Sequence, residues 1–188
     1  AFRYSGHSGH DGDALEMIKA VDGATRNLTW LNKQPNTMIL PSGAPQYTNM
    51  GVGAVYKMSG ILVNEKGERF ACENGDTWEL MLSMEENERQ YLLMDQENYD
   101  AFNKAMSDRK IFNPEDPAKW TADDYTGQPF YKGADTLEEL AEKLDVPAEA
   151  LKATVAQYNE AVSSGTPDEF GRELTTTIAE EGRYYALE

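Results

Sequence analysis

Residues 135–172 constrain the fold more than any other stretch, because their pattern predicts two consecutive helices with marked ends. Thr136 stands three residues before Glu139, and this spacing predicts a capping box at the start of the first helix. Pro147 suits the first turn of the second helix, and Gly165 predicts its end. The chain is therefore expected to contain a helical pair that packs one side against a core.

Both predicted helices carry apolar side chains at helical spacing. The first face consists of Leu137, Leu140, Ala141 and Leu144, and the second of Leu151, Val155, Tyr158 and Val162. Upstream, the pattern predicts helices at 13–20, 78–84 and 98–106 and strands at 54–56, 60–63, 69–72, 91–95 and 128–132. Residues 25–31 have the composition of a β-strand, and residues 113–129 are predicted to form a loop. This irregular alternation indicates an α+β fold, a small twisted mixed or antiparallel sheet with flanking helices.

Composition excludes several classes of partner. The formal net charge is −16, and such an acidic chain is unsuited to nucleic acid or to anionic membrane surfaces. No apolar run approaches the roughly 18 residues that cross a bilayer. We therefore expect a soluble chain without membrane insertion, while its compartment stays open. Cys72 is the only cysteine, so no internal disulfide can form.

Four blocks of sequence, taken in order, resemble one family. They are GDALEM at 12–17, GILVNEKGERF at 60–70, DTLEELAEKLDVPAEALKATVAQYNEAVSSGTPDEFGR at 135–172 and YYALE at 184–188. Together they resemble the flavoprotein subunit of fumarate reductase and its soluble flavocytochrome relatives, which include urocanate-reductase-like and 3-ketosteroid-dehydrogenase-like enzymes. The resemblance is to the capping domain, which lies on the substrate side of these flavoproteins.

The resemblance implies a division of the chain and a larger parent protein. Residues 1–22 are expected to be a remnant of the flavin-domain loop and helix, 23–183 the capping domain, and 184–188 the start of a strand that returns to the flavin domain. No G-x-G-x-x-G motif is present, so FAD is expected in the parent protein and not in this chain alone. The expected partners are the flavin domain of the same polypeptide and an unsaturated small molecule. Alone, the chain is expected to be inactive.

Two positions depart from the family pattern. In fumarate reductases a flavin delivers hydride to an activated alkene, while the capping domain supplies a histidine in an H-P-T segment and an arginine after the hairpin. Here Gln34 and Thr77 stand at those places. A neutral amide cannot hold a carboxylate by charge, so an enone, enoate or aromatic acrylate is favoured over fumarate. Gln34 can equally be an ordinary loop amide, and Thr77 a helix N-cap, a role open to Asp76 as well.

Aromatic side chains offer a further candidate for the substrate wall. Tyr56, together with Tyr47, Trp30 and Met58, can line a pocket for an aromatic substrate, although aromatic residues more often belong to a core or to an interdomain surface. Arg69 is a possible catalytic arginine by type, but its place in the G-E-R-F hairpin favours a structural ion pair.

Near the start of the chain, Gly12 and Asp13 match a segment that touches the flavin side of the parent, so the resemblance implies cofactor contact there in the full protein. His7 and His10 are the only histidines, and no metal site is predicted from them. The main alternative is a freestanding small-molecule binding or interaction module that has no flavin chemistry, and a purely structural domain is a further one.

Overall fold

The computed structural model describes residues 9–30, 32–173 and 175–188, and it divides the chain into two compact units, 1–34 and 35–188. In the first unit, α1 (Asp13–Ala20) follows Gly12, whose backbone is left-handed with φ of 99°. The β character predicted for 25–31 is not found in 25–30, because Asn27 has φ of 58° and Trp30 N–H bonds back to its carbonyl. Residue 31 lies outside the described residues.

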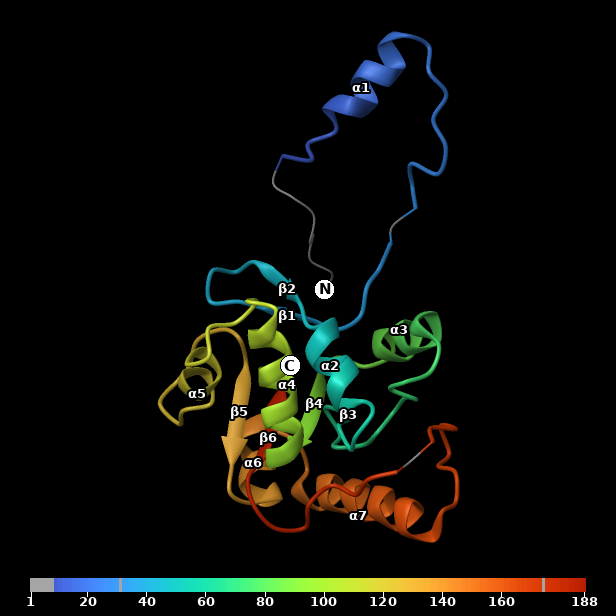
Figure 1. The fold of residues 1–188 in the computed structure, drawn as a ribbon. Helices are drawn as coiled ribbons and strands as arrows, with labels where there is room; N and C mark the ends of the chain where they lie inside the picture. Colours follow the sequence, from blue (N-terminus) through green and yellow to red (C-terminus); the bar gives the residue numbers. More distant parts are fainter. Residues whose placement is uncertain (1–8, 31, 174) are drawn as a thin grey trace. The chain divides into compact units, whose positions relative to one another are not determined.

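The second unit holds two small antiparallel sheets and six helices among its described residues (Figure 1). Its elements are β1 (Thr37–Ile39), β2 (Pro45–Tyr47), α2 (Asn49–Val55), β3 (Ile61–Asn64), α3 (Thr77–Glu85), β4 (Gln90–Asp95), α4 (Gln96–Asp108), α5 (Asp116–Trp120), β5 (Tyr131–Ala134), α6 (Leu137–Leu144), α7 (Ala148–Ser164) and β6 (Tyr184–Leu187). The predicted α+β fold with flanking helices is confirmed.

The larger sheet has the order β3-β4-β6-β5, and every neighbouring pair is antiparallel. The last strand of the chain is thus an inner strand: Leu187 is paired with Leu92 on one side and with Tyr131 on the other. The stretch 184–188, expected to begin a strand toward a flavin domain, is in this structure part of the second unit's own sheet.

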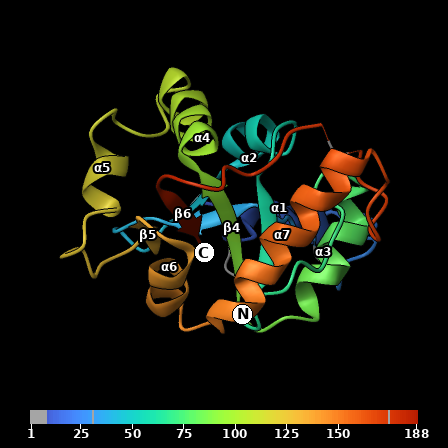
Figure 2. The same cartoon turned by 90° about the horizontal axis from the view of Figure 1, so that it is seen from below.

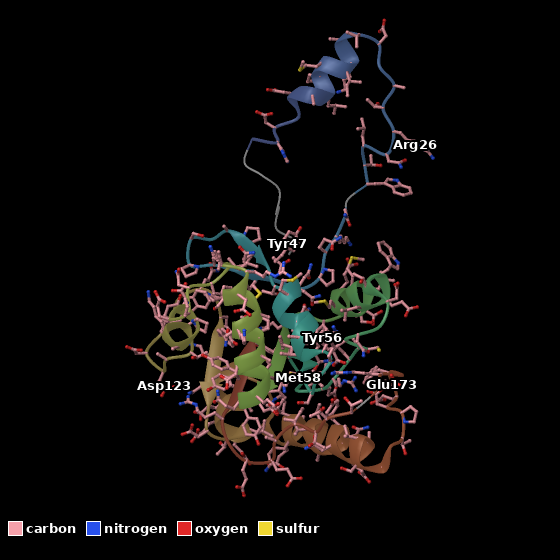
Figure 3. All side chains as sticks on the ribbon, in the orientation of Figure 1. Arg26, Tyr47, Tyr56, Met58, Asp123 and Glu173 are labelled. Atoms are coloured by element: carbon pink, nitrogen blue, oxygen red, sulfur yellow. The ribbon has the colours of Figure 1, made fainter. Side chains whose placement is uncertain are left out.

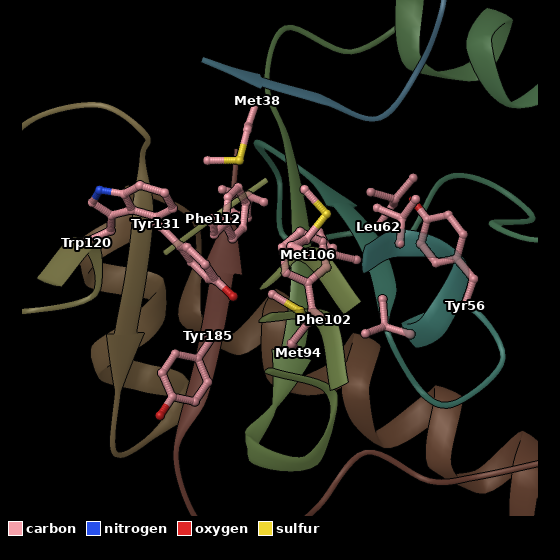
Figure 4. Close-up of a cluster of buried hydrophobic side chains, with 14 of the residues drawn as sticks. Met38, Tyr56, Leu62, Met94, Phe102, Met106, Phe112, Trp120, Tyr131 and Tyr185 are labelled. Atoms are coloured by element: carbon pink, nitrogen blue, oxygen red, sulfur yellow. The ribbon is translucent and has the colours of Figure 1, made fainter. Parts of the chain in front are cut away.

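The sheet separates two hydrophobic cores, because successive strand residues point to opposite faces. On one face Leu62, Leu92 and Met94 pack with α2 and α4 around Phe102. Figure 4 shows Leu62, Met94 and Phe102 in this cluster. On the other face Ile61, Val63 and Leu93 pack with α6 and α7. Figure 2 shows these two helix pairs on opposite sides of β4.

The helical pair has the predicted caps with two refinements. Thr136 Oγ1 accepts a hydrogen bond from Glu139 N–H at 3.1 Å. The Glu139 carboxylate bonds Asp135 N–H at 3.1 Å, one residue earlier than in the usual capping box. Pro147 is the N-cap of α7 and not a residue of its first turn. Gly165 ends the helix in a left-handed conformation, as predicted.

Two predicted strands are wrong. Residues 54–56 belong to the end of α2, because its turn at Gly51 lies directly against the Phe102 ring of α4, and this packing overrides the strand preference of the valines. Residues 69–72 make only an isolated bridge between Arg69 and Val63. The 113–129 loop contains the short helix α5. The strand predicted at 128–132 begins only at Tyr131, after a proline that cannot donate to the ladder.

Candidate substrate-facing site

Asn36 joins the start of β1 to both ends of α2. Its carbonyl oxygen accepts hydrogen bonds from Thr48 N–H at 2.9 Å and from Thr48 Oγ1 at 2.8 Å. Its side-chain oxygen accepts a bond from the Tyr56 hydroxyl at 3.2 Å. Asn36 has φ of 63°, a left-handed conformation that asparagine tolerates better than most residues. A polar cluster of neutral groups therefore forms where β1 meets α2.

Tyr56 is 6% exposed, and it links this cluster to the interior. Burial, reinforced by the nearby Glu73 carboxylate, raises the pKa of the Tyr56 phenol well above its ordinary value. The hydroxyl thus stays protonated and can donate a hydrogen bond. Figure 3 shows Tyr56 at the end of α2, with Tyr47 on β2.

Beside Asn36 and Tyr56 lies a cleft of about 140 Å³, which we call the neutral cleft. Its lining comes from β1, α2, β3, β4, β6, the end of α3 and the segment that follows α3. The lining residues are Asn36, Thr37, Met38, Thr48, Val52, Tyr56, Leu62, Met84, Glu88, Arg89, Gln90, Leu92, Leu187 and Glu188. Apolar side chains and neutral polar groups thus form most of the lining, and Glu88, Arg89 and Glu188 add charges to it. A mainly apolar lining with a few polar groups is typical of small-molecule sites.

Large hydrophobic side chains are exposed at the same end of the second unit. Among its described residues these are Tyr47 on β2, Met50 on α2, and Trp78 and Leu82 on α3. Figure 1 shows β1, β2 and α3 at the end opposite α6 and α7. The second unit therefore presents its exposed apolar side chains away from the helical pair.

The other residues predicted for the substrate wall are exposed. Gln34 belongs to the first unit, and its amide Nε2 donates to Asn32 Oδ1 at 3.0 Å. Thr77 is the first residue of α3, but Asp76 is the N-cap, accepting bonds from the N–H groups of Trp78 and Glu79. The capping alternative for Thr77 is therefore wrong, and the one for Asp76 is confirmed. Neither Gln34 nor Thr77 lines the neutral cleft.

A buried cluster of charges, the ion-pair centre, consists of Arg69, Glu73, Asp168 and Arg172. Arg69 donates to both carboxylate oxygens of Glu73, at 2.8 and 2.7 Å, and also pairs with Asp168. Burial by itself would lower the pKa of Arg69, but its bonds to Glu73 and Asp168 outweigh this effect and raise the pKa. The structural ion pair predicted for Arg69 is confirmed.

Arg172 is the part of this centre that sequence reasoning missed. It is 1% exposed and donates to Glu73 at 2.9 Å and to the carbonyls of Tyr56, Met58 and Gly60 at 2.8–3.0 Å. Its position at the end of the E-F-G-R block was the available signal. The centre ties the loop around 168–172 to the segment between α2 and β3.

The cofactor implied by the resemblance can be tested against these residues. A cavity of about 470 Å³ lies between α7 and the 167–170 loop, and three carboxylates, from Glu68, Asp168 and Glu169, line it. They would repel a pyrophosphate, and the one arginine there, Arg69, is already paired. A side chain added at Gly12 would meet nothing within 4 Å, so no close cradle surrounds that glycine. These residues do not fit FAD, and no catalytic step is derived through it.

Neither a metal-binding cluster nor a membrane-spanning helix is found in the described residues. They contain no group of three or more His, Cys, Asp or Glu side chains placed to hold a metal ion, and His7 lies outside them. Within the same ranges, no helix is both long and apolar enough to cross a membrane.

Comparison with known proteins places the chain in a family. Residues 4–188 match the model of a family described as FAD binding domain. A curated fumarate reductase (cytochrome) of Shewanella frigidimarina is 30% identical over 179 residues, 94% of this chain and 27% of the relative. The NADH:acrylate oxidoreductase of Vibrio harveyi is 29% identical over 153 residues, 79% of this chain and 14% of that protein. The chain thus spans about a quarter or less of these relatives.

A solved structure shares the fold. The solution structure of a fumarate reductase flavoprotein subunit from Lactobacillus plantarum superposes with a TM-score of 0.61 at 22% identity, covering 72% of this chain and 85% of that one. The family match extends over nearly the whole chain and agrees with these relatives and with the fold. The chain therefore belongs to the FAD-binding family of fumarate-reductase-type flavoproteins.

Proposed function

We propose that this chain, through residues 23–183, acts as the capping domain of an FAD-dependent oxidoreductase that reduces or desaturates a carbon–carbon double bond. In this role the domain closes over a flavin domain of the same polypeptide and forms one wall of the substrate site. Closure excludes water and aligns the substrate. Membership in the flavoprotein family and the resemblance to capping domains support this role.

One observation carries the proposal: the exposed apolar side chains Tyr47, Met50, Trp78 and Leu82 gather on elements at one end of the second unit. Exposed apolar surface of this kind marks a face that another domain or a ligand covers. Residues 1–22 are proposed to belong to the flavin side. Gly12 and Asp13 are proposed to contact the cofactor only where the flavin domain of the longer protein completes the site. Gln34, Thr77 and Tyr56 are proposed to contribute to the substrate wall.

The substrate is proposed to be an enone, enoate or aromatic acrylate. Gln34 and Thr77 are uncharged, so they cannot hold the carboxylates of fumarate as a histidine and an arginine would. The relative from Vibrio harveyi, an acrylate oxidoreductase by name, is consistent with a substrate other than fumarate.

The chain alone is proposed to bind no FAD, and gel filtration tests this. The chain is mixed with excess FAD, and the protein peak is examined for a yellow chromophore. We expect none, because the described cavities suit neither the pyrophosphate nor the size of a dinucleotide. Stoichiometric retention of FAD would overturn the capping role, since the chain would then hold the cofactor by itself.

The second candidate is a freestanding binding module without flavin chemistry. Its support is the absence of charge at Gln34 and Thr77. A separately expressed flavin domain of a close relative distinguishes the two functions. Specific association with this chain supports the capping domain, and absence of association supports the module.

A further inference from the structure

The stretch that builds β1, β2 and α2 at one end of the second unit is uncharged. Residues 35–56 contain no Asp, Glu, Lys, Arg or His, although 27% of the whole chain is Asp, Glu, Lys or Arg. This stretch forms β1, β2 and α2 and supplies the Asn36, Thr48 and Tyr56 cluster. A ligand that rests on this stretch therefore meets hydroxyl, amide and hydrocarbon groups only.

The neutral cleft has the size of one ring. Its volume of about 140 Å³ is close to the roughly 150 Å³ of an apolar protein cavity that holds a benzene molecule. Side chains from both sides of the cleft, including Met38, Val52 and Leu92, supply hydrocarbon contact. A six-membered ring fits this space, whereas a drug-sized or steroid-sized ligand would not.

Hydrogen-bond donors stand at one end of this cleft. Tyr56 is protonated, for the reason given above, and its hydroxyl reaches Asn36 Oδ1 at 3.2 Å, a distance long for an O–H donor. The Asn36 amide nitrogen has no hydrogen bond within the described part of the chain. The Tyr56 hydroxyl already donates its one proton to Asn36, so the Asn36 amide N–H is the neutral donor left for the carbonyl oxygen of a ligand.

The charges at the other end of the cleft disfavour an anion. Arg89 is the one cation among the lining residues, and it is paired with Glu188 at 3.4 Å and stacked over Tyr91 at 5.1 Å. Glu88 adds a second carboxylate to the lining. A ligand carboxylate would find its one possible cation already neutralised and would face a net negative charge.

We infer that the neutral cleft binds an uncharged six-membered ring that bears a carbonyl group, with the carbonyl oxygen directed to the amide of Asn36, which the Tyr56 hydroxyl holds in place. The inference deepens the proposed function, because this ring would be the part of the substrate that the capping domain holds. Only the statement that this ligand is a substrate depends on the proposed function. The binding itself needs no flavin.

The test uses the whole chain without flavin, with ¹³C-labelled methyl groups followed by NMR. The probe is 2-cyclohexen-1-one, with fumarate at equal concentration as the anionic comparison. We expect the enone to shift methyl signals of Met38, Val52 and Leu62, which line the cleft, and to leave those of Leu151 and Val155, on the other face of the sheet, in place. Fumarate should shift neither set.

A matched pair of variants tests the donors. Asn36→Asp keeps the acceptor for Tyr56 and tolerates the left-handed backbone, but it replaces the amide donor with a charge. It should weaken enone binding by about threefold to tenfold or more, the worth of one hydrogen bond. Asn27→Asp makes the same change at another left-handed asparagine, exposed and outside the cleft, and should leave binding unchanged.

The outcomes separate the two proposals. Fumarate binding as tight as enone binding, enone shifts outside the cleft, no shift with either probe, or equal affinity of the two variants would each overturn the cleft assignment. Thermal unfolding of each variant shows that it is folded. Tyr56→Phe removes the hydrogen bond that positions the Asn36 amide, and it should also weaken enone binding. Failure of the chain to associate with a flavin domain would overturn the capping role without altering these titrations.

Discussion

The ion-pair centre and the neutral cleft lie in the same unit and use polarity in opposite ways. In the centre, Glu73 and Arg172 are fully buried charges that partner each other and nearby backbone carbonyls. In the cleft, polar contacts come from neutral groups such as Asn36. The difference shows that buried charge in the ion-pair centre serves to join segments, while the part of the cleft built by residues 35–56 is left uncharged.

Tyr56 connects the two regions. Its carbonyl oxygen accepts a bond from Arg172 at 3.0 Å, and its hydroxyl bonds Asn36 at 3.2 Å. The end of α2 is therefore held by the ion-pair centre while its aromatic side chain lines the cleft. Disruption of the ion-pair centre should therefore change the position of Tyr56 in the neutral cleft.

The largest effect is expected from Glu73→Gln. The substitution leaves the buried guanidinium group of Arg172 without a counter-charge and leaves Arg69 with Asp168 alone. Breaking a buried pair in this way typically costs about 3–5 kcal/mol. Urea unfolding followed by circular dichroism measures it. The exposed ion pair of Glu138 and Lys152 is the control, and Glu138→Gln should move the midpoint far less. Equal shifts would mean that the centre does not hold the fold together.

Two glycines of α2 provide a matched pair near the cleft. A methyl group at Gly51 would lie 2.5 Å from the ring of Phe102, which is fully buried, so Gly51→Ala should destabilise the domain by about 1–3 kcal/mol. At Gly53 the added methyl meets nothing within 4 Å, and Gly53→Ala should stabilise by up to about 1 kcal/mol through helix propensity. Denaturation midpoints that move in the same direction for both variants would contradict the packing of α2 on α4.

Alkaline pH probes the residue shared by both regions. Because the folded-state pKa of Tyr56 is raised, the unfolded chain releases this proton first, and stability should fall as pH rises above about 10. Release of this one proton from the unfolded chain lowers the free energy of unfolding by about 1.4 kcal/mol per pH unit. Tyr56→Phe should remove that share of the slope when unfolding is measured between pH 9.5 and about 11. An unchanged slope would show that the phenol is not buried in solution.

The smallest effect concerns the start of α3. Asp76→Ala removes the side chain that accepts bonds from the N–H groups of Trp78 and Glu79, and loss of an N-cap costs about 1 kcal/mol. Thr77→Ala removes a hydroxyl that caps nothing and should change stability little. The thermal midpoints of the two variants give the comparison. A larger loss for Thr77→Ala would reverse the assignment of the cap.

Local signals were sufficient for much of the fold. The capping box at Thr136, the stop at Gly165 and the apolar faces of α6 and α7 act within a few residues, so they can be read directly from spacing. The same holds for the strand at 91–95. The short helices were predicted less well: residues 54–56 and 116–120 form helix where strand and loop were expected, because contacts with distant elements decide such short segments.

The candidate site likewise combines features that the sequence determined with features that only the tertiary structure decided. The sequence by itself determined the family resemblance, the neutral residues Gln34 and Thr77 and the uncharged stretch 35–56, since these depend only on residue identity and order. Tertiary structure alone decided that Tyr56 lines a cleft with Asn36, and that Arg172 reaches Glu73 across nearly a hundred residues. No local pattern carries that information, because burial of a charge or a phenol is set by which distant segments pack around it.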